Sequence, residues 1–377
     1  MFTEKMEQYV VDTNESLKAF IRTFAPIPAP SHNEDRRVEF LTGWLKEQGV
    51  LNVHVDEAKN VIWSINDTGS NDLTVFMAHT DVVFPDTTPL PFVIDGDVYR
   101  CPGITDDTSP LSVLLYSAMY FFKNGCAPKT GILIIANSCE EGLGNLKGSR
   151  CIVDTYGDRI KHFYTVESSP KRIVNQAVGS HRYRVTVKTE GGHSYSKFGN
   201  RNAIRCLAQM IDTFYSVKVP EKPGTKTTYN VGMISGGTSV NTICQEASML
   251  FEYRSTDFEC LQKMKEMFDS VIAAYRTMGI TVDVELLGER PCANVDPVAE
   301  QALCDLVADA IREIFGIEGT YGSSSTDANY PLSKGIPAVC VGSVEPHLCH
   351  TREEFLETKD LPDAMRIVMR LLAYYFE

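Results

Sequence analysis

The 377-residue sequence lacks features that mark several classes of protein. No apolar run approaches the roughly 18 residues that a membrane-spanning helix needs. Residues 1–20 carry charges throughout and have no apolar central segment, so we expect no secretory signal peptide. The eleven cysteines are an odd number, are scattered, and include no Cys-x-x-Cys pair. This usage is typical of a reducing compartment, so we expect a cytoplasmic protein without a disulfide framework or a thiolate zinc site.

Positive charge is also scarce. The chain has 36 Lys and Arg against 49 Asp and Glu, a net charge of −13. This balance argues against nucleic acid or an anionic membrane surface as a partner. The hydrophobic fraction of 43% is that of an ordinary globular protein. The length exceeds the usual ceiling for one hydrophobic core, so two domains are expected.

The first part of the chain alternates short apolar runs with helical patterns. Ser31-x-x-Glu34 has the spacing of a capping box and precedes a helical pattern that Gly49 ends. A second, almost wholly apolar helix is predicted before Gly125. Strands are predicted at residues 60–65, 73–78, 131–137 and 162–166. Strands that are apolar on both faces and alternate with helices indicate an α/β fold, a mostly parallel sheet sandwiched by helices.

The pattern changes at Gly179, where apolar and polar residues begin to alternate. The predicted order from there is strand, helix, strand, strand, helix, strand, which is a ferredoxin-like α+β arrangement. After about residue 290 the first pattern returns, with helical segments around the buried strand "PAVCVGS". We therefore expect one domain built from residues 1–178 and 290–377, and a second domain, residues 179–289, inserted into it.

Acidic and histidine residues follow each buried strand of the first domain. The strand ends are followed by His79 and Asp81, by Glu140 and Glu141, by Glu167 and by His350, and Asp106 and Asp107 directly precede the apolar helix. Because the ends of parallel strands form one crevice, we expect these side chains to converge. Each pair alone is more often a salt bridge, a solvated pair or a helix cap. Their shared position at several strand ends is what indicates a site.

Converging carboxylates repel one another unless a positive charge holds them, and these segments contain no Lys or Arg cluster. A metal is the natural counter-charge. Histidine nitrogen and carboxylate oxygen suit zinc, with manganese or cobalt possible. The ligands outnumber what one tetrahedral ion needs, so they predict two divalent metal ions about 3.5–4 Å apart with a bridging carboxylate.

With these motifs in place, the chain resembles the dinuclear zinc metallopeptidases that include peptidase T, glutamate carboxypeptidase, aminoacylase, acetylornithine deacetylase and succinyl-diaminopimelate desuccinylase. The resemblance spans nearly the whole chain. It is carried by "MAHTDVV", "GITDDTSPLSVLLY", "NSCEEGLGNLKGS", "GGHSYSKFGNRNAI", "NVGMISGGTSVNTICQEASMLFEYRS", "GSSSTDANYPLSKGIPAVCVG" and "HTREEF". It implies a zinc exopeptidase-like catalytic domain with an inserted lid and dimerisation domain, and a homodimer formed through that lid.

The resemblance also implies a role for each residue of the motifs. His79 and Glu167 would bind one metal, Glu141 and His350 the other, and Asp106 both, with Asp81 orienting His79 and Glu140 acting as general base. In the inserted domain, His193 would reach the substrate of a partner subunit, and Asn241 and Arg254 would hold the substrate carboxylate. Two positions depart from the usual pattern: Glu167 where many members have Asp, and Asp107-Thr108-Ser109 where Lys-Gly is usual.

The favoured function is hydrolysis of short peptides by a di- or tripeptide aminopeptidase of the peptidase T type. "GGHSYSKFGN" and "SSTDAN" favour this group. An N-acyl amino acid amidohydrolase on the same scaffold is the alternative, since the sequence does not show whether an amine or an acyl chain precedes the scissile amide. A catalytically silent binding protein is the alternative of another class, against which the retained Glu140 speaks.

Overall fold

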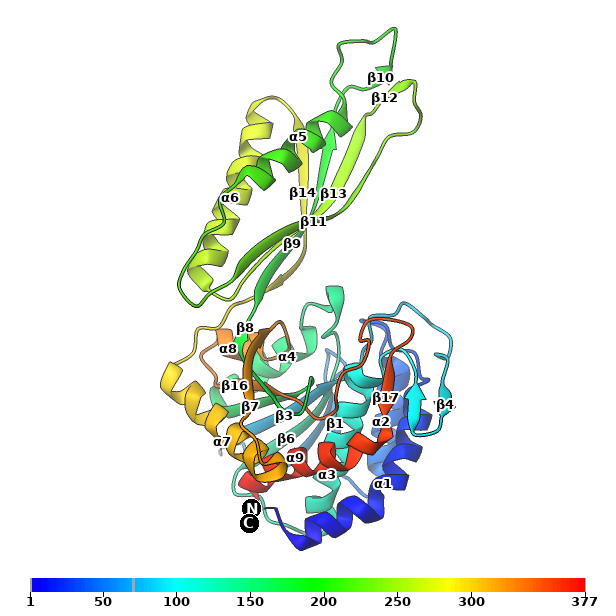
Figure 1. The fold of residues 1–377 in the computed structure, drawn as a ribbon, viewed down its shortest axis with the longest axis vertical. Helices are drawn as coiled ribbons and strands as arrows, with labels where there is room; N and C mark the ends of the chain where they lie inside the picture. The colour runs from blue at the N-terminus through cyan, green and yellow to red at the C-terminus, as the bar shows by residue number, and fades with distance from the viewer. Residues whose placement is uncertain (1, 70–71, 377) are drawn as a thin grey trace. The chain divides into compact units, whose positions relative to one another are not determined.

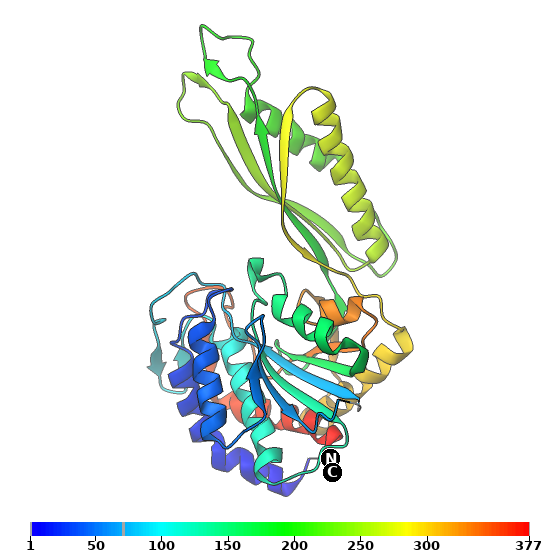
Figure 2. The same cartoon turned by 180° about the vertical axis from the view of Figure 1, so that it is seen from behind.

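The computed structural model describes residues 2–69 and 72–376 and divides them into two compact units. Unit 1 combines the chain up to Ala177 with the segment from Asn294 onward, and unit 2 is Val178–Ala293. Figures 1 and 2 show that unit 2 is a single excursion of the chain between two parts of unit 1. Within the described residues, no helix is long and apolar enough to cross a membrane.

Unit 1 is built on a mixed sheet. Its order is β1 (Val53–Val55), β2 (Val61–Ile65), β6 (Gly131–Asn137), β3 (Leu73–His79), β7 (Ile160–Val166), β16 (Ala338–Val341), β8 (Arg172–Ala177) and β15 (Thr320–Ser324). The central neighbours β6, β3, β7 and β16 run parallel, and so do β8 and β15, whereas β1 with β2, β2 with β6 and β16 with β8 are antiparallel. The predicted mostly parallel sheet is therefore confirmed. The carboxyl ends of the four central strands share one edge.

Helices cover both faces of this sheet (Figures 1 and 2). One layer contains α1 (Glu4–Phe24), α2 (Asp35–Glu47), α3 (Ser109–Lys123), α7 (Pro297–Phe315) and α9 (Leu361–Leu372). The other face carries α4 (Lys147–Tyr156) and α8 (Asn329–Ser333). A small antiparallel sheet of β4 (Val93–Asp95), β5 (Val98–Arg100) and β17 (Phe355–Glu357) lies beside them. β3 and β6 are buried along their whole length, which explains their unbroken apolar sequences.

The expected capping box is wrong, and the reason bears on the site. α2 begins at Asp35, and no side chain caps its N-terminus. The Ser31 hydroxyl instead donates to Asp81 Oδ2 at 2.6 Å, and the Glu34 carboxylate accepts from the His32 backbone N–H at 2.8 Å. The C-terminal end of the helix agrees with the sequence prediction: α2 ends at Glu47, and Gly49 follows with φ of +88°.

Unit 2 has the strand, helix, strand, strand, helix, strand order that the sequence predicts. The elements are β9 (Gly179–Lys188), α5 (Ala203–Ser216), β11 (Thr227–Gly236), β13 (Glu246–Ser255), α6 (Phe258–Thr277) and β14 (Thr281–Arg290), with a short ribbon of β10 (Gly192–His193) and β12 (Thr242–Ile243). The antiparallel sheet has the order β11-β13-β9-β14. The core lies between the sheet and the two helices and includes Val185, Met249, Phe251, Met210 and Phe268.

Candidate metal centre

His79 is the last residue of β3, and its imidazole is almost completely buried. Its Nδ1 lies 2.9 Å from the backbone oxygen of Asp81 and 3.5 Å from the Asp81 Oδ1, while its Nε2 lies 3.1 Å from Asp106 Oδ1. Burial alone would lower the pKa of His79. The hydrogen bond to Asp106, the charge of Asp107 and the hydrogen bond to Asp81 outweigh it and raise the pKa well above its ordinary value. The imidazole is thus held by anionic neighbours on both of its nitrogens.

Asp81 organises the turn that follows the neighbouring strand β6. Its Oδ1 accepts the backbone N–H of Glu140 at 3.0 Å, and its Oδ2 accepts that of Glu141, also at 3.0 Å. Burial would raise the pKa of Asp81, but the hydrogen bonds from His79 and Ser31 and the His79 charge outweigh it and lower the pKa. The carboxylate therefore holds two predicted functional residues in place in addition to facing the imidazole of His79.

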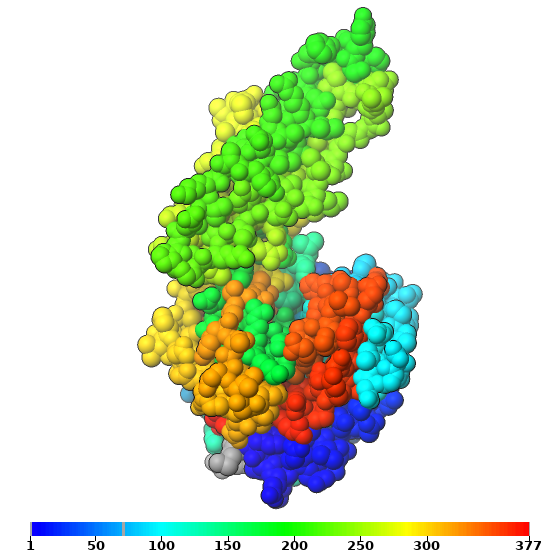
Figure 3. Space-filling model, in the orientation of Figure 1, coloured from blue at the N-terminus to red at the C-terminus, as the bar shows by residue number. Residues whose placement is uncertain are grey.

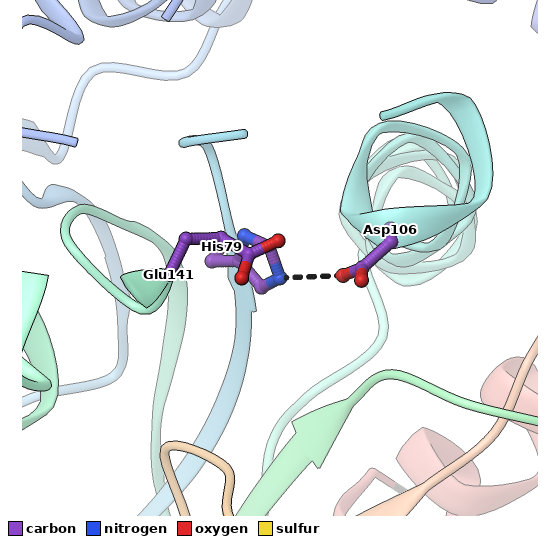
Figure 4. Close-up of side chains that lie close together, drawn as sticks. All are labelled: His79, Asp106 and Glu141. Carbon is purple, nitrogen blue, oxygen red and sulfur yellow. Dashed lines mark hydrogen bonds and ion pairs between the residues drawn. The ribbon is translucent and has the colours of Figure 1, made fainter. Parts of the chain in front are cut away.

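Asp106 lies in the irregular segment between β5 and α3, and its two oxygens face different histidines. Oδ1 is 3.1 Å from His79 Nε2, and Oδ2 is 3.0 Å from His350 Nε2. Burial opposes ionisation of Asp106, but the hydrogen bonds from His350 and His79 dominate and lower its pKa. Figure 4 shows Asp106 reaching toward His79 from the segment that leads into α3, with Glu141 beside the imidazole. One carboxylate oxygen per histidine is the arrangement that a bridging ligand requires.

Glu141 and His350 meet on the other side of Asp106. His350 Nε2 lies 3.3 Å from Glu141 Oε1. Hydrogen bonds to Asp106 and Glu141 raise the pKa of His350. Burial raises the pKa of Glu141, and the hydrogen bond to His350 opposes this. Ligand atoms of His79, Asp106 and Glu141 all lie within 4.8 Å of one another, close enough to share an ion.

Glu140 and Glu167 face the same group of charges. Glu140 is 5% exposed, and its backbone is fixed by Asp81. Glu167 follows β7, and its backbone N–H donates to Val341 O at 2.9 Å. Burial and the charges of Glu140 and Asp106 raise the pKa of Glu167 well above its usual value. Several carboxylates with raised pKa values around two histidines form a donor set whose repulsion a pair of divalent cations would relieve. The residues present therefore fit a dinuclear metal site.

Two further buried acids, Asp107 and Asp327, lie beside the centre. Asp107 Oδ2 accepts the backbone N–H of His79 at 2.9 Å, which secures the end of β3. Asp327 Oδ2 accepts from the Asn137 side chain at 2.5 Å, and burial followed by the charge of Glu140 raises the pKa of Asp327. Asp327 belongs to the motif "GSSSTDANYPLSKG", so the resemblance pointed at the segment without indicating this residue.

The three residues predicted in the inserted domain lie in unit 2, and the structure brings two of them together. His193 is in β10, and the backbone N–H of Ser194 donates to Asn241 O at 2.9 Å. Both His193 and Asn241 are exposed. Arg254 lies near the opposite end of β13, where its guanidinium makes two hydrogen bonds to Glu252, at 3.0 and 2.9 Å. Within one chain, Arg254 and Asn241 therefore do not meet at one carboxylate.

A second group of possible ligands in unit 1 consists of His347, Glu357 and Asp360. The ammonium of Lys359 pairs with Glu357, so this group already contains a compensating cation. It is partly exposed, in contrast to the acids around His79. The acids around His79 are mostly buried, whereas this second group lies at the surface beside a lysine.

Comparison with known proteins agrees with this geometry. A sequence model described as peptidase family M20/M25/M40 matches residues 75–374. An uncharacterized Bacillus subtilis protein, YqjE, is 26% identical over 344 residues, which cover 87% of this chain and 88% of that protein. A candidate succinyl-diaminopimelate desuccinylase, DapE, from Mycobacterium tuberculosis is 22% identical over 92% of this chain and 95% of its own length.

Solved structures show the same fold. The Bacillus cereus aminopeptidase PepT superimposes with a TM-score of 0.72 at 21% identity, covering 95% of this chain and 97% of that one. A Staphylococcus aureus tripeptidase gives 0.77 at 20% identity, covering 96% and 98%. The Bacillus subtilis YXEP protein, a dinuclear metal binding peptidase of family M20, gives 0.64 at 16% identity, covering 97% and 98%. The chain therefore belongs to the M20/M25/M40 peptidase family and is a metal-dependent hydrolase.

Proposed function

We propose that this hydrolase is a dinuclear metallo-exopeptidase that cleaves short peptides, an aminopeptidase of the peptidase T type. The observation that carries the proposal is Asp106, whose two oxygens lie 3.1 Å and 3.0 Å from the imidazoles of His79 and His350. The likeness to an aminopeptidase and a tripeptidase in fold supports the choice of substrate class. Zinc is the metal that the donor set favours, with manganese or cobalt as substitutes.

In this proposal Asp106 would be a ligand shared by both metal ions, His79 and Glu167 would complete the first site, and Glu141 and His350 would complete the second. When bound, the metal pair makes a water molecule acidic enough to ionise near neutral pH and polarises the scissile carbonyl. Glu140 would accept a proton from the attacking water through its carboxylate and deliver it to the departing amine. The hydrogen bond from the Glu140 backbone N–H to Asp81 fixes the backbone position of Glu140.

The inserted domain would complete the site by association of two chains. His193 and Asn241 are exposed on one ribbon and carry the polar groups that an oxyanion and a substrate carboxylate would need. Arg254, near the opposite end of β13, would contribute its guanidinium to a substrate carboxylate. Met233 and Ile234 are 60% and 56% exposed on β11, an edge strand, which supports burial against a second copy in a homodimer. All eleven cysteines are free, which supports a cytoplasmic location.

An N-acyl amino acid amidohydrolase is the second candidate, favoured by the likeness in sequence to the desuccinylase candidate. The two activities differ in the group that precedes the scissile amide. A silent binding protein would have no use for Glu140, which is buried next to the predicted ligands.

A substrate panel separates these functions. Di- and tripeptides should be compared with N-acetyl and N-succinyl amino acids, with zinc, manganese or cobalt added. We expect hydrolysis of peptides that have a free amino terminus. In Glu140→Gln, which keeps size but cannot accept the proton, we expect both metals bound and turnover reduced by about 10²–10⁴. Preference for acylated substrates would replace the first candidate with the second, and near-normal turnover in Glu140→Gln would remove Glu140 as the base.

A further inference from the structure

Glu354 is a fully buried residue whose carboxylate accepts hydrogen bonds from the loop that carries Asp106. Its Oε2 accepts the backbone N–H of Gly103 at 2.8 Å, and its Oε1 accepts those of Thr105 at 2.7 Å and Asp106 at 3.0 Å. The hydroxyl of Thr105 donates to the same Oε1 at 2.7 Å. All of these donors belong to the four residues that lead up to and include the predicted bridging ligand.

This loop has little regular backbone to hold it in place. Gly103 has φ of +75°, and Asp106 and Asp107 have non-helical backbone angles. Buried N–H groups that no strand or helix satisfies need another acceptor, and the Glu354 carboxylate accepts three of them. The backbone at Cys101 adds one further contact, in which its N–H donates to Glu354 O at 3.2 Å. The backbone from which the Asp106 side chain extends is therefore hydrogen-bonded to Glu354.

Glu354 also connects Asp106 with the segment that carries His350. It lies four residues after His350 and directly before β17, which pairs with β5, the strand that precedes the Asp106 loop. Figure 3 shows this C-terminal segment in orange-red against the cyan segment that precedes the loop. His350 Nε2 lies 3.0 Å from Asp106 Oδ2. One buried carboxylate thus connects the Asp106 loop with the chain segment that carries His350.

From these contacts we infer that Glu354 is a positioning residue that sets the geometry, and hence the affinity, of the metal pair by holding Asp106 in register with His350. The inference rests on the proposed dinuclear function. It differs from an ordinary role in stability, because it predicts a change in the metal site itself. Residues that support metal ligands typically change metal affinity by about 10- to 100-fold when mutated.

Glu354→Gln tests this with little change in size. The amide oxygen can keep the donors of Thr105 and Asp106, while the amide nitrogen then faces the N–H of Gly103, which is a clash of two donors. Glu353→Gln is the matched control, since it removes the same charge from an adjacent, exposed side chain. Cobalt should be titrated into each metal-free protein, with the visible absorption of the bound ion recorded, and thermal unfolding should be measured without metal.

We expect Glu354→Gln to bind cobalt roughly 10- to 100-fold more weakly and with an altered visible spectrum, and Glu353→Gln to match the wild type. A purely structural role would lower the metal-free melting temperature and leave affinity and spectrum unchanged, and that result would overturn the inference. If Glu354→Gln does not fold, Thr105→Val removes one of the same hydrogen bonds and should weaken cobalt binding in the same direction. Wild-type protein that binds no metal would refute the proposed function instead, before the variants are compared.

Discussion

Replacing Asp81 with Asn separates two roles that the structure gives to one carboxylate. Oδ2 accepts the Ser31 hydroxyl at 2.6 Å and the Glu141 N–H at 3.0 Å, whereas Oδ1 accepts the Glu140 N–H at 3.0 Å and lies 3.5 Å from His79 Nδ1. The retained oxygen of Asn should therefore take the side of Ser31 and Glu141, where both contacts are short. The amide nitrogen is then left against the N–H of Glu140, the predicted general base.

The magnitude follows from the bond that is lost. A buried hydrogen bond to a charged group contributes about 1.5–3 kcal/mol, which corresponds to about 10- to 100-fold in rate if it is lost in the transition state. Because the disturbance is centred on Glu140, we expect kcat of Asp81→Asn to fall by that factor with little change in KM. Ser31→Ala keeps both backbone contacts and should lose less than about tenfold.

The assay is steady-state peptide hydrolysis at saturating metal, with metal content measured on the same samples. If Asp81 only orients the imidazole of His79, the defect of Asp81→Asn should appear as weak metal binding, and excess metal should restore kcat. A kcat within about twofold of the wild type at full metal occupancy would refute the role assigned to the Glu140 contact.

Two further predictions concern the partner subunit and pH. Inactive Glu140→Gln chains mixed with inactive His193→Ala chains should recover up to about a quarter of the wild-type activity, since half of randomly formed dimers would contain one complete site; mixed dimers without recovery would mean that His193 acts within its own chain or not at all. Burial raises the pKa of Glu300 to about 7, so its proton is held more tightly in the folded state than in the unfolded state. The resulting stabilisation is complete below the unfolded pKa of 4.5 and is lost as pH rises through about 7. Relative to wild type, Glu300→Gln should therefore gain roughly 3 kcal/mol of unfolding free energy between pH 4 and pH 8. Chemical denaturation of both proteins at both pH values measures this gain, and a difference between the proteins that does not change with pH would contradict it.

The sequence could predict the convergence of acids and histidines because parallel strands share an edge. The residues after β3 and β6 need only that topology to become neighbours, as the contacts of Asp81 with Glu140 and Glu141 illustrate. The order of elements in unit 2 can also be predicted from the sequence, because its strands alternate apolar and polar residues. These features depend on local periodicity and on chain order.

What the sequence could not predict are contacts made by long-range partners. Ser31 and Glu34 have the spacing of a capping box, but Asp81, fifty residues away, takes the Ser31 hydroxyl. Glu354 looks like one acid among several in "HTREEF", and only the fold places it under the Asp106 loop. The helix α1, Glu4–Phe24, is hard to recognise in the sequence, because frequent charges obscure the helical spacing of its buried residues Val10, Leu17 and Ile21.

In the proposed function Asp106 would be shared by two metal ions that the reaction requires. The direct measurement is the number of ions per chain, determined by elemental analysis together with activity as metal is returned to chelated, dialysed protein. We predict no peptide hydrolysis without metal, and activity that rises with zinc, cobalt or manganese until about two ions are bound per chain. Full hydrolysis by metal-free protein, or maximal activity with a single ion and no further binding, would contradict the account.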